Sequence, residues 1–304
     1  MSTIEQALAK KLAAEKASKK LLQEPDITHA TEEENTVDQV AIEIPQAVEP
    51  THNKDENFLT INQDRLTKND FIDIQKNSPH NVLREEFRQI KRKLINNAFG
   101  AVSKTLEHPN LVMITSAKAN EGKTFVSINL ALSIASEQDK TVLLVDADVL
   151  KPSILKEFGL QPHRGLIEYL LGDIEDVSSI IYHSNIDNLK IIPAGTPHHL
   201  SNELLASERM TTLATELSTR YPDRIVIFDS PPLLGVNETP VLAHLMGQAL
   251  ITVEEGKTSI NDVNQASGLL NDKIAKGIVL NKAYYSQKEM YGYYGYGYGK
   301  RAAE

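Results

Sequence analysis

The sequence predicts a doubly wound α/β fold, in which helices flank a mostly parallel sheet, and two observations lead to this expectation. Six apolar runs have the length and composition of strands that are buried on both faces of a sheet. Stretches suited to helices fill the gaps between these runs, as expected when crossover helices join parallel strands. In such a fold, ligands bind beyond the carboxyl ends of the strands.

The elements of this fold are expected in order along residues 80–283. A first helix begins at about Ser78 or Asn81 and carries one apolar stripe. The members of the stripe are Val82, Phe87, Ile90, Leu94 and Ile95. The expected strands lie at 111–116, 141–148, 189–195, 224–230, 249–255 and 276–281. The remaining expected helices lie at 123–137, 165–172, 202–219, 238–246 and 259–272.

Three regions are expected outside this folded part. Residues 1–24 form a short amphipathic helix, either free on the surface or docked on a partner protein or a membrane surface. Residues 25–79 form an acidic disordered linker with at most a strand-like patch at 58–61, because they show no sustained hydrophobic period. Residues 284–304 form a flexible tail rich in tyrosine and glycine.

Composition excludes several classes of function. The 304 residues contain no cysteine, so disulfides, thiolate metal sites and cysteine nucleophiles are excluded. The formal net charge is −9, and residues 1–80 hold fifteen acidic and nine basic side chains, which does not suit a general nucleic-acid binder. The sequence contains no run of about 18 apolar residues, so we expect a protein that does not cross a membrane unaided.

A phosphate-binding loop is expected between the strand at 111–116 and the helix at 123–137. Residues 117–124 read AKANEGKT, which has the spacing of a P-loop with alanine in place of the first glycine. In such a loop, backbone N–H groups hold phosphate oxygens, Lys123 reaches the β and γ phosphates, and the Thr124 hydroxyl binds Mg²⁺. A loop that only resembles a P-loop is the alternative. The expected nucleotide-binding residues here are Ala117, Lys118, Ala119, Asn120, Glu121, Gly122, Lys123, Thr124 and Phe125.

Three aspartates at the ends of two expected strands support this P-loop NTPase fold. Asp229 suits the role of a Walker B aspartate near Mg²⁺, and Asp146 and Asp148 lie two residues apart on an extended segment. A cap of the following helix is the alternative for Asp148. We expect Lys123, Asp146, Asp148 and Asp229 to be catalytic. Asp146 is expected to accept or orient the proton of the hydroxyl group to which the phosphoryl group is transferred. The expected metal site consists of Thr124, Asp146 and Asp229.

Taken together, the motifs SAKANEGKT, LLVDADVLKPS and IVIFDSPPLL and the tyrosine-rich tail resemble the bacterial tyrosine kinases of polysaccharide synthesis. Further stretches, including ELLASERM and YGYYGYGYG, resemble the exosortase-associated tyrosine autokinase branch. The resemblance implies that ATP and Mg²⁺ are the cofactors and that Asp146 and Asp148 form the Walker A′ motif. It also implies that Asn281 contacts the adenine, although an asparagine at a strand end is as often a turn residue.

Two departures from the family pattern concern assembly and the phosphate loop. Members of the family use a Glu-x2-Arg-x2-Arg helix for self-association; Glu85 and Arg88 match it, but the third position is Lys91, which lacks the bidentate fork of arginine. Lys118 stands where ParA- and MinD-like ATPases carry a lysine that reaches a phosphate across a dimer. A solvated loop lysine is the alternative for Lys118.

The tail is the expected phosphate acceptor of an ATP-dependent protein-tyrosine autokinase that regulates exopolysaccharide synthesis and export. Glycine alternation leaves its phenol groups exposed to a neighbouring subunit. A ParA/MinD-like ATPase that acts as a nucleotide-gated positioning switch is the alternative function, and it has no need of such a tail. The expected acceptors are Tyr284, Tyr285, Tyr291, Tyr293, Tyr294, Tyr296 and Tyr298.

The resemblance also implies partners and a location. We expect a homo-oligomer, either a ring or a dimer, a membrane activator of the chain-length-determinant type, and a phosphotyrosine phosphatase that reverses the reaction. No nucleic acid is expected. The protein is expected in the cytoplasm, bound peripherally to the inner membrane through its partner.

Overall fold

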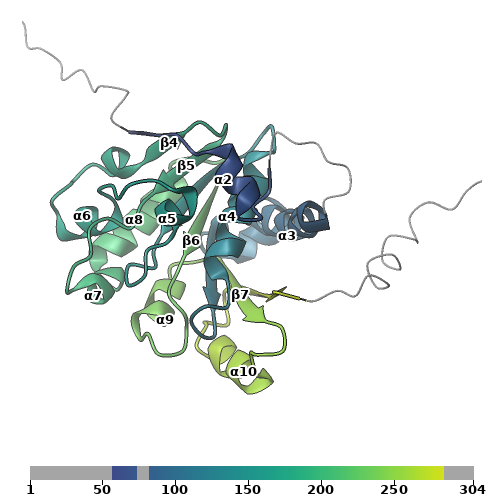
Figure 1. The fold of residues 1–304 in the computed structure, drawn as a ribbon. Coiled ribbons are helices and arrows are strands. Elements are labelled where there is room, and N and C mark those ends of the chain that lie inside the picture. The colour runs from purple at the N-terminus through teal and green to yellow at the C-terminus, as the bar shows by residue number, and fades with distance from the viewer. Residues whose placement is uncertain (1–56, 74–81, 284–304) are drawn as a thin grey trace, which may run out of the picture. The chain divides into compact units, whose positions relative to one another are not determined.

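A computed structural model describes residues 57–73 and 82–283 of the chain (Figure 1). The expected helix at 1–24, most of the expected linker and the tail at 284–304 lie outside these residues. The described residues form one sheet of eight strands in the order β1-β4-β5-β3-β6-β2-β7-β8. Neighbouring strands are parallel except β4 and β5, which are antiparallel. The predicted doubly wound fold is therefore confirmed.

The strands and helices alternate along most of the chain, which follows the order that the sequence predicts. The strands are β1 (Phe58–Leu59), β2 (Leu111–Ser116), β3 (Thr141–Asp146), β4 (Tyr182–Ser184), β5 (Leu189–Ile192), β6 (Arg224–Asp229), β7 (Gln248–Glu254) and β8 (Ala275–Asn281). The α-helices are α2 (Gln63–Lys68), α3 (Val82–Phe99), α4 (Lys123–Ala135), α5 (Ile154–Phe158), α6 (Leu166–Leu171), α7 (Ser201–Leu205), α8 (Glu208–Thr219), α9 (Glu238–Ala243) and α10 (Ile260–Gly268). Two 3₁₀ helices, at Ala101–Thr105 and Val177–Ile180, complete the described elements.

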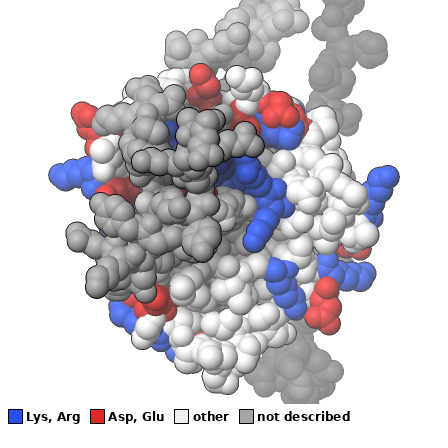
Figure 2. Space-filling view, turned by 90° about the vertical axis from the view of Figure 1, so that its right-hand side faces the viewer, with Lys and Arg blue, Asp and Glu red and all other residues white. Residues whose placement is uncertain are grey.

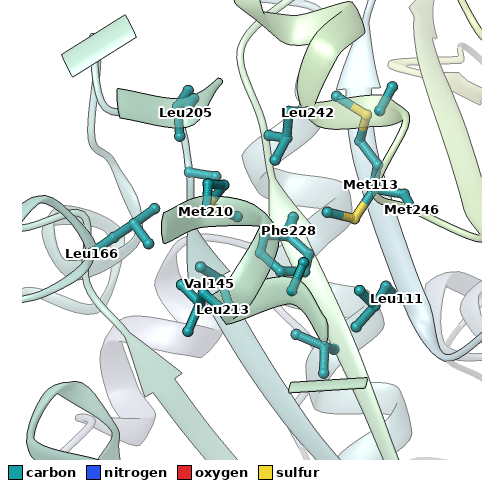
Figure 3. Packing of buried hydrophobic residues seen from close by; sticks show 14 of the residues in the cluster. Leu111, Met113, Val145, Leu166, Leu205, Met210, Leu213, Phe228, Leu242 and Met246 are labelled. Carbon is teal, nitrogen blue, oxygen red and sulfur yellow. The ribbon is translucent and has the colours of Figure 1, made fainter. Parts of the chain in front are cut away.

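The central strands are apolar along their length because side chains on both faces are buried. In β3, Val142 and Leu144 point to the face covered by α2, α3, α4 and α5, whereas Leu143 and Val145 point to the face covered by helices α6 to α10. Figure 3 shows the second face, where Phe228 of β6 packs among Met210, Leu213 and Leu242. A hydrophobic core thus lies on each face of the sheet, which explains why runs of consecutive apolar residues, rather than alternating ones, predict these strands.

The helix predicted at 202–219 consists of two helices in the structure. α7 ends at Leu205, and the side chain of Ser207 accepts a hydrogen bond from the Met210 backbone N–H to cap α8. Serine at this position favours a new helix start over continuation, because its hydroxyl satisfies a backbone donor that would otherwise lack a partner. The short elements β4 and α5 were not predicted, because three to five residues are too few to show a period.

The structure contradicts the expected disordered linker at residues 57–73. β1 pairs with β4, and Asn62 caps α2, because its side chain accepts hydrogen bonds from two backbone N–H groups at the start of the helix. Leu66 of α2 is fully buried, and the Ile72 backbone N–H donates to Asn129 Oδ1 on α4 at 2.8 Å. Burial of apolar side chains therefore attaches this segment to the domain, although its acidic composition favours disorder. The expected domain boundary at residue 80 lies too late in the sequence.

The helix α3 lies toward the face that Figure 2 shows, where Lys and Arg side chains occur both near the middle and at the margins and Asp and Glu side chains lie near the margins. Glu85 and Arg88 of α3 are half-exposed and form an ion pair of 3.1 Å with each other. Lys91 is buried instead, where its Nζ donates to the Ser133 carbonyl at 3.1 Å and pairs with Glu137. The expected association role of Lys91 therefore conflicts with its position, because the side chain fastens α3 to α4. A separate finding concerns the membrane: none of the described helices is both long enough and apolar enough to span a bilayer.

Candidate active site

The carboxyl ends of three neighbouring strands bring the predicted site residues together. β3, β6 and β2 are adjacent in the sheet, and Asp146 lies opposite Asp229 in the register of β3 and β6. The loop at 117–122 leads from β2 to α4, so Lys123 and Thr124 open a helix of thirteen residues at the same edge. The N-terminus of such a helix attracts anions through its free backbone N–H groups and its dipole.

The backbone of the loop explains why only one of the two consensus glycine positions, residue 122, requires a glycine. Gly122 has a φ of 92°, and a Cβ on it would overlap the side-chain amide of Asn281. Ala117 is buried and is not among the residues with positive φ, so a side chain is tolerated where the consensus has glycine. The alanine therefore does not prevent the P-loop conformation.

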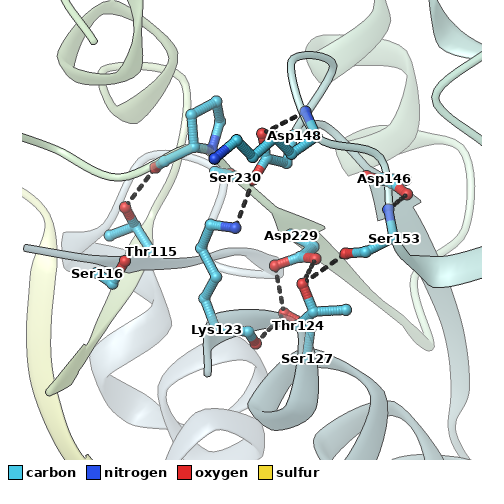
Figure 4. Close-up of polar contacts among 12 residues, drawn as sticks. Thr115, Ser116, Lys123, Thr124, Ser127, Asp146, Asp148, Ser153, Asp229 and Ser230 are labelled. Carbon is cyan, nitrogen blue, oxygen red and sulfur yellow. Dashed lines mark hydrogen bonds and ion pairs between the residues drawn. The ribbon is translucent and has the colours of Figure 1, made fainter. Parts of the chain in front are cut away.

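Lys123 forms an ion pair with Asp148 (Figure 4), and both side chains are largely buried. Burial lowers the pKa of Lys123, but the charges of Asp229 and Asp148 outweigh this effect, so that the pKa is raised overall. Asp148 also accepts a hydrogen bond from the Lys151 backbone N–H at 3.2 Å. The lysine is thus protonated and lies beside the loop that is expected to receive phosphates.

Asp229 binds two hydroxyl groups of α4. Thr124 Oγ1 donates to Asp229 Oδ2 at 2.6 Å, and Ser127 Oγ donates to Oδ1 at 3.1 Å. The hydroxyl of Ser153 lies 2.9 Å from Thr124 Oγ1 (Figure 4). Burial raises the pKa of Asp229 to about 6, against the opposing effects of Lys123 and Thr124.

Asp146 is also buried, and its two oxygens differ in their contacts. Oδ2 accepts hydrogen bonds from the backbone N–H groups of Ser153 at 3.1 Å and Ile154 at 3.0 Å, which begin α5. Oδ1 is buried without a hydrogen-bond partner among the described residues. Burial raises the pKa of Asp146 well above its ordinary value, and the charge of Asp229 raises it further. The helix-capping role expected as an alternative for Asp148 thus belongs to Asp146.

The described residues contain no group of three or more His, Asp or Glu side chains placed to hold a metal ion by themselves. Mg²⁺ usually takes one or two carboxylates from the protein and completes its shell with water and substrate phosphates. The oxygen donors near the P-loop are the Thr124 hydroxyl and the carboxylates of Asp146 and Asp229.

Two further predicted residues contact the loop itself. The side-chain amide of Asn281 donates to the Glu121 carbonyl at 2.9 Å, and the Lys118 ammonium pairs with Asp262 of α10 at 2.7 Å. Asn281, Gly122 and Phe125 line a groove of about 1260 Å³ between α3, α4 and β8. The Lys118 side chain remains 57% exposed while it pairs with Asp262, so the solvated loop lysine expected as an alternative is compatible with the structure.

Four residues of this region were missed by sequence reasoning: Ser127, Ser153, Thr258 and Asp262. Ser127 was detectable, because it lies three residues after Thr124 and therefore on the same face of α4. Ser259 and Asp262 show the pattern of a capping box, which predicts a helix start but no contact with the P-loop. No local pattern identifies Ser153 or Thr258. The predicted tyrosine acceptors lie outside the described residues.

Comparison with known proteins identifies the family. A model described as an AAA domain matches residues 110–276. Tyrosine-protein kinase YwqD of Bacillus subtilis is 33% identical over 219 residues, which are 71% of this chain and 88% of that protein. The kinase domain of Escherichia coli tyrosine kinase ETK has a TM-score of 0.59 and 28% sequence identity, and the match covers 69% of this chain and 82% of that domain.

A more distant likeness concerns the alternative function. The septum site-determining protein MinD of Pyrococcus horikoshii, solved with Mg-ADP, has a TM-score of 0.50 and 22% identity, covering 59% of this chain and 72% of that protein. Identity this low shows the shared fold alone, so it does not favour a positioning switch. The kinase relatives and the P-loop fold together imply nucleotide binding. The chain belongs to the bacterial tyrosine-protein kinases and is an enzyme that phosphorylates protein tyrosine.

Proposed function

We propose that this kinase transfers the γ-phosphoryl group of ATP to tyrosines of its own C-terminal tail. The observation that supports this most is the group formed by Lys123 with Asp148 and Thr124 with Asp229 at the P-loop. The tail adds a set of acceptors, since seven of the ten tyrosines in the chain lie between residues 284 and 298. Assignment to the exosortase-associated branch is a proposal that rests on sequence resemblance.

Mg²⁺ is the proposed metal, and the residues present fit it. Asp146 Oδ1 is a buried carboxylate oxygen without a partner among the described residues, as expected of an oxygen that faces a cation or its water. The Thr124 hydroxyl, Asp229 and Asp146 would hold the ion, directly or through water. When bound, Mg²⁺ neutralises charge on the β and γ phosphates.

The side chains of the site divide the work of phosphoryl transfer. Lys123 leaves Asp148 and binds the β and γ phosphates, where its charge stabilises the transition state. The tyrosine oxygen forms a bond to the γ phosphorus while the bond to the β–γ bridging oxygen breaks and ADP leaves. Asp146 is the proposed acceptor of the phenol proton, in the arrangement in which its Oδ1 faces the ion through water rather than directly. Asn281 would contact the adenine from the groove between α3 and β8.

The biological role follows from the family resemblance. The kinase would regulate exopolysaccharide synthesis and export at the inner membrane, through a membrane activator of the chain-length-determinant type. Self-association through Glu85 and Arg88 would bring the tail of one subunit to the site of another, and a phosphotyrosine phosphatase would reset it. Each phosphate adds about −1.5 to −2 charges, so a loaded tail would be repelled from an acidic neighbour.

The test is to change all seven tail tyrosines to phenylalanine. This change removes the acceptor oxygens and keeps the rings, so phosphotyrosine measured by mass spectrometry should nearly vanish while ADP binding stays at the wild-type level. The control is Lys123→Met, which keeps the tail but loses the cation that binds the phosphates. Wild-type protein produced with its membrane activator and still free of tail phosphate would refute the proposal.

A further inference from the structure

The phosphate-binding loop is closed around the buried carboxylate of Glu121. Its Oε2 accepts a hydrogen bond from the Lys118 backbone N–H at 2.8 Å, so one end of the loop is tied to the other. Its Oε1 accepts a hydrogen bond from the Thr258 hydroxyl at 2.5 Å. Thr258 precedes α10, which makes this a link between two segments that are 137 residues apart.

The direction of the Thr258 hydroxyl is set by a second hydrogen bond. Thr258 Oγ1 accepts from the Glu254 backbone N–H at 2.9 Å at the end of β7. Its own hydrogen is therefore free to donate to Glu121 and is aimed there. A buried carboxylate is costly unless its oxygens are hydrogen-bonded, so this donor stabilises the charge that organises the loop.

A second link joins Lys118 to Asp262. The Lys118 ammonium lies 2.7 Å from Asp262 Oδ2, and the Ser259 hydroxyl donates to the same oxygen at 2.7 Å. The hydrogen bond from Lys118 lowers the pKa of Asp262, and the one from Ser259 lowers it further. Because the capping box at the start of α10 holds this carboxylate in place, Lys118 is drawn toward a fixed position.

The conformation that these links hold includes two residues in the left-handed region. Asn120 and Gly122 have positive φ values, of 69° and 92°. Asparagine and glycine adopt such values most readily, but glycine in particular is also free to adopt many others, so the links select one conformation of the loop. Backbone N–H groups can receive a phosphate only when they are already directed at it, so a held loop binds more tightly than a mobile one.

We propose that Thr258 and Asp262 are positioning residues for nucleotide binding, which act through Glu121 and Lys118 to hold the phosphate-binding loop. This proposal depends on the function proposed above in one respect only, namely that this loop binds the phosphates of the nucleotide. It assigns Lys118 to a contact within its own chain. The links act on the free loop, so they affect the affinity for nucleotide more than the rate of the chemical step.

The test measures the dissociation constant of a fluorescent ADP analogue with the full-length protein, together with KM for ATP and kcat. Thr258→Val removes the hydroxyl and keeps the shape, and it should weaken binding about tenfold, as expected for a lost hydrogen bond to a charged group. Thr258→Ser keeps the hydroxyl and should restore binding to within about twofold of the wild type. Both variants should change kcat less than KM.

Asp262→Asn should weaken binding about threefold, because the ion pair with Lys118 is partly exposed. If Lys118 and Asp262 act as a unit, the double variant Lys118→Met/Asp262→Asn should weaken nucleotide binding by less than the product of the factors measured for the two single variants. Asp272→Asn is the matched control, since Asp272 pairs with Lys276 at 3.3 Å on the surface. This control should bind nucleotide as the wild type does.

The outcomes separate a positioning role from a merely structural one. Wild-type affinity in Thr258→Val, or equal losses in Thr258→Ser and Thr258→Val, would overturn the proposal. Thermal unfolding without nucleotide identifies any variant that is unfolded at the assay temperature. If the Thr258 variants are unfolded, the affinities of Asp262→Asn and Asp272→Asn decide between the two roles, and equal affinities would overturn the proposal. Binding does not require tyrosine phosphorylation, so a chain without phosphotyrosine would refute the proposed autokinase and leave this test intact.

Discussion

Lys123 and Asp148 form a buried ion pair at the P-loop. The lysine side chain is 12% exposed and the aspartate side chain 4% exposed, so the two charges compensate each other in a mostly dry environment. In the proposed function, nucleotide phosphates would replace Asp148 as the partner of the lysine. Removing either side chain alone leaves the other charge buried without its partner, which is costly.

We therefore predict that Lys123→Met destabilises the protein as well as abolishing autophosphorylation. The free energy of unfolding should fall by about 3 kcal/mol, and adding Asp148→Asn should recover most of this loss without restoring activity. Urea denaturation and phosphotyrosine immunoblotting measure the two effects. A single Lys123→Met variant that is as stable as the wild type would contradict the buried ion pair.

Asp229 gives a prediction about pH. The pKa of Asp229 in the folded protein is about 6, above its ordinary value of 3.8, so the folded state binds the proton more tightly than the unfolded state does. The stability that this protonation contributes is fully present below pH 3.8 and is lost as the pH rises through 6. Its contribution should fall by about 2 kcal/mol between pH 4.5 and 7.

Asp229→Asn removes this titration, so its free energy of unfolding should change less than that of the wild type over the same interval. Urea denaturation of both proteins without nucleotide at pH 4.5 and 7 measures the difference. The charge of Asp229 helps to raise the pKa of Asp146, so Asp229→Asn also weakens the pH dependence that Asp146 contributes, and both effects reduce the change in the variant. Parallel changes in both proteins would show that Asp229 does not titrate in this interval.

At the scale of elements, β1 and α2 pack onto the domain through buried side chains and hydrogen bonds. Leu59, Ile61, Leu66 and Ile72 are buried, and Arg65 donates to the carbonyls of Lys156 and Glu157 at 2.8 and 2.9 Å. The sequence analysis allowed a strand-like patch at 58–61, where β1 lies, but it missed α2, because a helix of six residues shows no clear period and the acidic surroundings resemble a linker. Only contact with the rest of the domain stabilises these elements.

Leu66→Ala should accordingly lower the free energy of unfolding by about 2–5 kcal/mol, as expected for a fully buried leucine. Lys68→Ala on the exposed side of the same helix is the control and should change it by less than about 0.5 kcal/mol. Chemical denaturation of both variants tests the assignment. Equal and small effects would mean that α2 is detached in solution.

At the scale of the whole molecule, the described residues contain both hydrophobic cores and the complete P-loop. We predict that a fragment of residues 57–283 folds and binds an ADP analogue with the affinity of the full chain. It should incorporate no phosphate into itself, because it lacks the proposed acceptors. Fluorescence binding and mass spectrometry test this, with a fragment of residues 80–283 as the comparison, which should be less stable because it lacks β1 and α2.

The sequence by itself determined the six long strands, the phosphate-binding loop and the aspartates at the strand ends. These features are local: a strand buried on both faces needs a run of apolar residues, and a P-loop needs its glycine, lysine and threonine at fixed spacing. Asp146 and Asp229 could be placed near each other because the carboxyl ends of parallel strands share one edge of the sheet.

Only the tertiary structure decided which side chains become partners. Lys123 pairs with Asp148, Lys91 of α3 is buried against α4, and Lys118 pairs with Asp262 from a distant part of the chain. The order of the strands and the antiparallel placement of β4 also depend on packing between remote segments. A charged residue carries no local mark of its partner, because the pairing depends on which strand ends and helix starts the folded sheet brings together.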